Sequence, residues 1–100
     1  MEALTNPQKR KLKALAQRLE PLLRIGKQGV SDAFVSSLDT ALEQRELVKI
    51  QFQELKEQRK EIAPRLAEQT RSHLIMQVGH VAVFYRQHPD PQRRKIKFDI

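Results

Sequence analysis

The sequence predicts an α/β fold: a single compact domain in which helices and strands alternate before a final pair of strands. Two observations predict it. Apolar residues recur at helical spacing in three segments, and short runs rich in Val, Ile and Leu lie between and after these segments. The predicted order is α-β-α-β-α-β-β, so we expect a partly parallel sheet completed by an antiparallel hairpin. One hundred residues form one domain on the usual size prior.

The first predicted helix spans residues 5–20. Thr5 and Gln8 have the spacing of a capping box, and Pro21 ends the helix. Its apolar stripe consists of Leu12, Leu15, Ala16 and Leu19. A short buried strand is expected at residues 22–25, directly before a loop that contains two of the three glycines of the chain.

The remaining elements follow from caps and alternation. Ser31 is a good N-cap for a second helix, and residues 46–53 alternate as a strand does. A third helix that begins between residues 59 and 61 places Pro64 in or just after its first turn, where proline costs least. Strands at 73–78 and 81–86 are joined by a two-residue hairpin connection. We expect the domain to span residues 1–88 and residues 89–100 to form a basic, flexible tail.

Positive charge gathers at the two ends of the chain. The net charge is +7; residues 1–27 hold seven basic and two acidic residues, and residues 86–100 hold five basic and two acidic residues. If both ends fold onto one side, the protein has a strongly positive face of the kind that binds polyanions. The candidate cations are Lys9, Arg10, Lys13, Arg18, Arg24 and Arg86, with Arg93, Arg94, Lys95 and Lys97 in the tail adding non-specific attraction.

The stretch "IGKQGVSD" places a G-x-x-G loop between a strand and a helix. Glycine lets another backbone approach closely, and a helix N-terminus favours anions. Lys27 adds a full charge and Gln28 an amide donor, so Gly26, Lys27, Gln28 and Gly29 are the leading candidates for holding an RNA phosphate. The loop alone is a weak signal, because a tight strand-to-helix turn also uses such glycines.

Taken together, four segments resemble the CRM domain, named for chloroplast RNA splicing and ribosome maturation, in its stand-alone bacterial YhbY-like form. They are "LTNPQKRKLKALAQRLEPLLRIGKQGV", "ALEQRELVKIQF", "EIAPRLAEQT" and "QVGHVAVFYR". The resemblance runs from about residue 4 to residue 86. It implies a mixed four-stranded sheet similar to the C-terminal domain of a translation initiation factor. It also implies RNA binding through the G-x-x-G loop and basic first helix, with precursors of the large (50S) ribosomal subunit as the associated target.

Other chemistry finds little support in the sequence. There is no cysteine, and the separations of His73, His80 and His88 match no compact metal site. No catalytic constellation is present, so we predict a protein that is not an enzyme and needs no cofactor or metal. The sequence shows neither a signal peptide nor an apolar run long enough to span a bilayer. We therefore expect a cytoplasmic monomer.

Two further interpretations stay open at this point. On an alternating strand one of Phe84 and Tyr85 points outward, where an exposed ring stacks on a base, although both rings more often pack internally.

The function predicted is binding of ribosomal RNA in large-subunit precursors to assist ribosome assembly, with ribosomal proteins as further partners. The alternatives are a protein-docking assembly module without RNA contact, or a basic amphipathic helix that binds a membrane surface.

Overall fold

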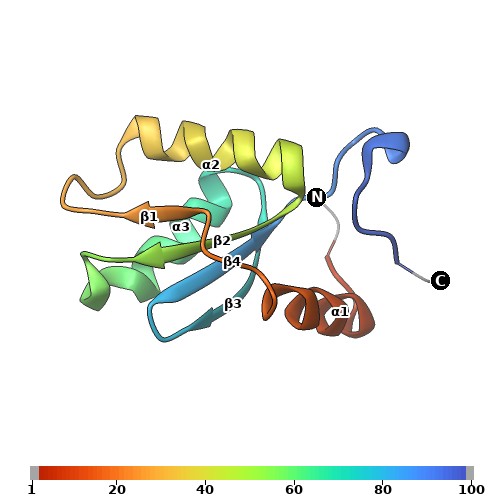
Figure 1. Ribbon diagram of the computed structural model, residues 1–100, viewed down its shortest axis with the longest axis horizontal. Coiled ribbons are helices and arrows are strands. Elements are labelled where there is room, and N and C mark those ends of the chain that lie inside the picture. The colour runs from red at the N-terminus through yellow and green to blue at the C-terminus, as the bar shows by residue number, and fades with distance from the viewer. Residues whose placement is uncertain (1–2, 99–100) are drawn as a thin grey trace.

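Four strands form one mixed sheet in the computed structural model, which describes residues 3–98 (Figure 1). The helices are α1 (Asn6–Ala16), α2 (Asp32–Arg45) and α3 (Arg59–Gln69), and the strands are β1 (Leu23–Ile25), β2 (Leu47–Phe52), β3 (His73–Val78) and β4 (Val81–Tyr85). Two short 3-10 turns, η1 (Lys56–Gln58) and η2 (Pro91–Arg93), complete the order. The strands lie in the order β1-β2-β4-β3. Because β1 is parallel to β2 and the other pairs are antiparallel, the predicted fold class is confirmed.

Each face of the sheet carries its own apolar cluster. The larger cluster lies under α2 and α3 and includes Ile25, Ile50 and Phe84. The smaller lies under α1 and includes Leu12 and Tyr85. Phe84 and Tyr85 do point to opposite faces, but both faces are covered there and the residues are 0% and 1% exposed. Neither ring is therefore available to stack on a base.

The start of α1 is as predicted, and its end is not. Thr5 Oγ1 accepts a hydrogen bond from the Gln8 N–H, and Gln8 Oε1 accepts one from the Thr5 N–H, which completes the capping box. The helix ends at Ala16, four residues before the predicted end. Two turns follow, closed by the N–H groups of Arg18 and Leu19. They let Leu19 pack onto the smaller cluster.

The predicted starts of α2 and α3 and the hairpin are confirmed. Ser31 Oγ accepts the Phe34 N–H at the start of α2. Pro64 lies inside α3, just after its first turn as predicted, and its side chain faces solvent. The carbonyl that proline leaves without an N–H partner can therefore be hydrated. Gly79, with a φ of +57°, opens the two-residue connection between β3 and β4.

Residues 88–98 lie against the body of the domain, and residues 89–98 of this segment were expected to belong to a flexible tail. Glu46 is 1% exposed, and its carboxylate accepts the backbone N–H groups of His88, Lys95 and Ile96. Ile96 and Phe98 pack against the smaller apolar cluster. We call this arrangement the Glu46 clamp. The mobility of the segment in solution remains a prediction.

Candidate nucleic-acid interface

The G-x-x-G segment forms a tight turn at one end of the molecule. The Gly29 N–H donates to the Gly26 carbonyl at 3.0 Å, which closes a turn with Lys27 and Gln28 at its tip. Both tip side chains are exposed. The turn leads through Val30 into the capped start of α2. The predicted loop therefore presents a cation and an amide to solvent from a fixed backbone.

The two glycines of this turn differ in what the fold requires of them. Gly29 has a φ of +68°, and a Cβ added there would lie 3.1 Å from Leu55 Cδ1. A Cβ added to Gly26 would meet no atom within 4 Å, and its φ is not in the left-handed region. The backbone conformation and the close contact with Leu55 thus explain why residue 29 is a glycine. Neither reason applies to Gly26, and the space beside its Cα is not filled by any described residue.

The helix start beside the turn is a weaker anion site than the sequence indicated. Ser31 already takes the N–H of Phe34, so one of the free donors of the first turn is occupied. Asp32 is exposed in the same turn and offsets the partial positive charge of the helix N-terminus. The full charge of Lys27, exposed at the tip, is therefore a stronger attraction for an anion at this turn than the helix N-terminus is.

Beside the turn, half of one sheet face is left uncovered. Side chains of directly paired residues project from the same face, and the register aligns Arg24, Gln51, Val81 and Val78 in one row across all four strands. Lys49 projects from this face in the next row. We call these five residues the open sheet face. Arg24 and Val78 are exposed, and Arg24 Nε donates to Gln51 Oε1 at 3.3 Å. Lys49 and Gln51 were not predicted, although the alternation of β2 already placed them opposite the apolar residues.

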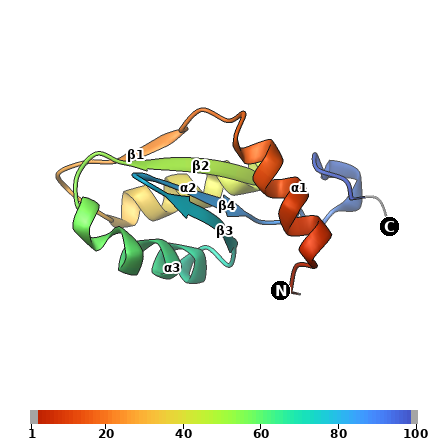
Figure 2. The ribbon, with the colours of Figure 1, turned by 90° about the horizontal axis from the view of Figure 1, so that it is seen from below.

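The predicted cations of α1 lie away from the turn. Figures 1 and 2 show the turn at one end of the long axis and α1 toward the other, next to the C-terminal segment, along a molecule 42 Å long. Lys9 and Lys13 border the start of β3, and Arg10 is exposed on the same helix. The cations of α1 and the G-x-x-G turn are thus close in sequence but apart in space, and the open sheet face lies between them.

Arg18 and Arg86, also predicted to bind RNA, have other surroundings. Arg18 lies in the turn after α1, beside an apolar cavity. Arg86 donates to Asp39 Oδ1 at 2.6 Å and to the Thr70 carbonyl at 2.8 Å. These contacts tie the end of β4 to α2 and α3. They give Arg86 a structural role, so we leave it out of the proposed interface.

Neither a metal site nor a membrane-spanning helix is found in the described part of the chain. Among residues 3–98, no group of three or more His, Asp or Glu side chains is arranged to hold a metal ion. None of the helices in this range is long and apolar enough to cross a bilayer.

The fold and site define a small α/β domain with a G-x-x-G turn before its second helix and a half-open mixed sheet. The family model described as the CRS1 / YhbY (CRM) domain matches residues 4–86. The chain therefore belongs to the CRS1/YhbY (CRM) domain family, as the resemblance indicated.

Similar proteins include bacterial relatives of the same length class. "Probable RNA-binding protein YqeI" of Bacillus subtilis is 36% identical over 85 residues, which are 84% of this chain and 88% of the relative. "Probable RNA-binding protein PA4753" of Pseudomonas aeruginosa is 30% identical over 92 residues, covering 91% and 88%. The solution structure of SAV1595 from Staphylococcus aureus superposes with a TM-score of 0.76 at 35% identity, covering 95% of this chain and all of that one. The names of these two bacterial relatives describe RNA binding and no enzymatic activity.

Proposed function

We propose that this protein binds RNA through the Gly26–Gly29 turn and the open sheet face. Its target in this proposal is ribosomal RNA in precursors of the large (50S) ribosomal subunit, whose assembly it assists in the cytoplasm. The observation that carries the proposal is the empty space at Gly26 beside the exposed Lys27 and Gln28. In this proposal a phosphate backbone occupies that space, with Lys27 as its cation and Gln28 as a hydrogen-bond donor. The names of the relatives support RNA as the partner.

The arrangement favours recognition of the RNA backbone over base reading. The open sheet face offers Arg24 and Lys49 to phosphates, and Gln51 to a phosphate or sugar. Both aromatic residues at the end of β4 are buried, so this face has no stacking platform like that of an RRM. RNA that runs along the sheet would pass from the turn to the cations of α1.

The salt dependence of binding reports how many phosphates the protein contacts. It therefore distinguishes RNA bound along the sheet and α1 from RNA bound by the turn alone. In this proposal the RNA passes six cations, which are Lys27, Arg24, Lys49, Lys9, Arg10 and Lys13. Single-stranded RNA that contacts all of them should lose affinity with a slope of about −4 in log K against log salt, because each phosphate contributes about −0.7. RNA held by the turn alone should give a slope of about −1.

The test is fluorescence anisotropy with a large-subunit ribosomal RNA fragment over a salt series. Lys27→Asp/Gln28→Asp places two carboxylates where the phosphate is proposed and should abolish binding. Lys60→Asp/Gln69→Asp makes the same chemical changes at exposed positions of α3, behind the opposite sheet face, and should bind much as the wild type does (Figure 2). If the two double variants bind the RNA with equal affinity, the G-x-x-G segment is a structural turn without a role in RNA binding. An unrelated RNA of the same length tests the ribosomal target, because equal affinity for both would remove that part of the proposal.

A further inference from the structure

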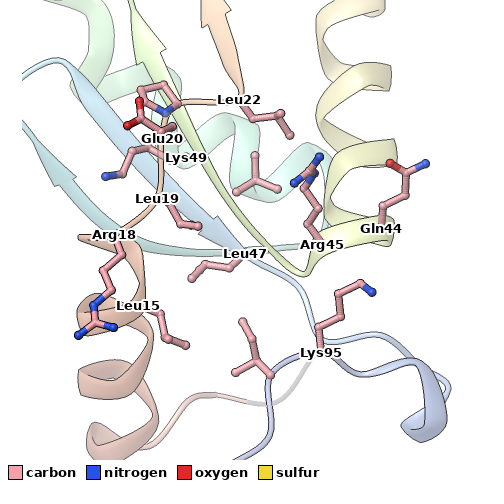
Figure 3. Close-up of a pocket in the computed structure, with 13 residues that line it drawn as sticks. Leu15, Arg18, Leu19, Glu20, Leu22, Gln44, Arg45, Leu47, Lys49 and Lys95 are labelled. Atoms are coloured by element: carbon pink, nitrogen blue, oxygen red, sulfur yellow. The ribbon is translucent and has the colours of Figure 1, made fainter.

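An apolar cavity with a basic rim lies beside the end of α1, away from the G-x-x-G turn. Its volume is about 730 Å³, within the roughly 300–1,000 Å³ typical of ligand sites. Its apolar lining comes from three places in the chain: the segment around the end of α1, the start of β2 and the C-terminal segment. The apolar side chains include Leu15, Leu19, Leu22, Leu47 and Ile96. Figure 3 shows several of these leucines around a common space.

We call the apolar side chains that line the cavity its floor, and two of them are more exposed to solvent than the residues of a domain core. Leu15 is 37% exposed and Leu22 is 40% exposed, and both line the cavity. Ile96 also lines the cavity, and the Glu46 clamp holds it through its backbone N–H. The cavity is therefore a product of the tertiary fold, because its walls come from segments more than seventy residues apart.

Four cations surround this floor and only one carboxylate does. The cations are Arg18, Arg45, Lys49 and Lys95, and the carboxylate is Glu20 (Figure 3). Within residues 3–98, the two carboxylate–cation pairs are Arg86–Asp39 and Arg93–Asp90. The four rim cations thus pair with no carboxylate of the described residues. An occupant that supplies carboxylates would complete this rim.

We propose that this cavity docks an acidic segment of a partner protein that inserts aliphatic side chains. The apolar lining favours a protein over RNA because it offers leucine and isoleucine and no aromatic ring on which an unstacked base would stack. An amphipathic helix with aliphatic anchors at i, i+3 and i+4 and glutamates between them matches an apolar floor with a cationic rim. Lys49 belongs both to the open sheet face and to this rim, so RNA on the whole sheet face and a protein in the cavity would compete for it. RNA held by the G-x-x-G turn, which lies away from the cavity, leaves the rest of the rim free for a protein (Figure 1). The domain would then bridge an RNA and a protein.

The probe is a labelled panel of designed helical peptides with leucine anchors and glutamates between them, at varied anchor spacing. Matched peptides replace every leucine by serine or every glutamate by lysine. We expect members of the acidic leucine series to bind and both matched series to fail. Leu15→Ser/Leu22→Ser should weaken binding about tenfold, the effect of losing an anchor contact. Arg45→Gln/Lys95→Gln should weaken it and reduce its salt dependence.

The controls separate this site from the proposed RNA interface. Lys27→Asp/Gln28→Asp should bind the peptide as the wild type does, so loss of RNA binding does not decide the peptide result. Methyl NMR of the leucines and isoleucines locates the ligand. The proposal would be overturned if no peptide of the acidic leucine series binds. It would also be overturned if both cavity variants bind these peptides as tightly as the wild type does. Methyl shifts at Leu22 and Ile96 on adding RNA alone would assign the cavity to RNA, and dimerisation that buries these methyls would assign it to a second copy.

Discussion

Removing one charge from the Glu46 clamp tests how firmly residues 88–98 belong to the domain. The Glu46 Oε2 atom accepts the His88 N–H at 2.7 Å, and Oε1 accepts the N–H groups of Lys95 and Ile96. Glu46→Gln keeps the size of the side chain and one acceptor oxygen. If that oxygen serves Lys95 and Ile96, the new amide group faces the N–H of His88, and two donors then oppose each other.

The expected loss of unfolding free energy follows from these three hydrogen bonds and from the burial of the segment that they hold. Losing one hydrogen bond to a charged group and leaving its donor unsatisfied costs about 1.5–3 kcal/mol of unfolding free energy. Glu46→Ala loses all three bonds, but release of the segment lets water reach the freed amides. Its cost is then limited by the lost burial of Ile96 and Phe98, at most about 3–6 kcal/mol for two apolar side chains.

A glycine variant supplies the internal control. Glu46 has a φ of +65°, where a residue with a Cβ is strained by about 1–3 kcal/mol. Glu46→Gly loses the same carboxylate as Glu46→Ala and relieves this strain, so it should be the more stable of the two.

Urea unfolding followed by circular dichroism gives the stabilities, and hydrogen exchange reports on the three bonded amides. We expect the His88 and Ile96 amides to be protected in the wild type and to exchange freely in Glu46→Ala. An unchanged urea midpoint in Glu46→Gln, together with fast exchange of these amides in the wild type, would refute the clamp. It would instead support the flexible tail that the sequence predicted.

Four further predictions concern the two glycines of the turn, Tyr85 and His73. Gly29→Ala should cost about 1–2 kcal/mol because of its left-handed φ, whereas Gly26→Ala should change stability by less than about 0.5 kcal/mol; equal melting temperatures would contradict this. The buried Tyr85 hydroxyl has no hydrogen-bond partner among the described residues, so Tyr85→Phe should leave stability unchanged or raise it by up to about 1 kcal/mol. Burial, with the charge of Glu46, raises the pKa of this single tyrosine to about 12, and an ultraviolet titration midpoint near 10 would count against that environment. Burial lowers the pKa of His73 below 6.5, so the folded state binds fewer protons than the unfolded state and stability should fall as pH drops below 6.5. His73→Phe keeps a ring beside Tyr85 and should remove this contribution; an identical pH dependence in both proteins would refute it.

Local signals in the sequence determined most of the elements. The Thr5–Gln8 capping box, the Ser31 cap and the Gly79 hairpin connection act within a few residues of themselves, so each is legible in the chain. The G-x-x-G turn was found in the same way, because its closing hydrogen bond joins Gly26 to Gly29. Family membership was also legible, since several segments occur in the order and spacing typical of the family.

Long-range packing decided the rest. The sequence joined the cations of α1 to the G-x-x-G turn because they are neighbours along the chain, but β1 carries the chain away from α1 and separates them. Strand register placed Gln51 beside Arg24, and no local pattern encodes which strands pair. The Glu46 clamp joins residues more than forty positions apart and turns a polar segment into one wall of a cavity. These features depend on desolvation and on hydrogen bonds between distant segments, which exist only once the chain has folded.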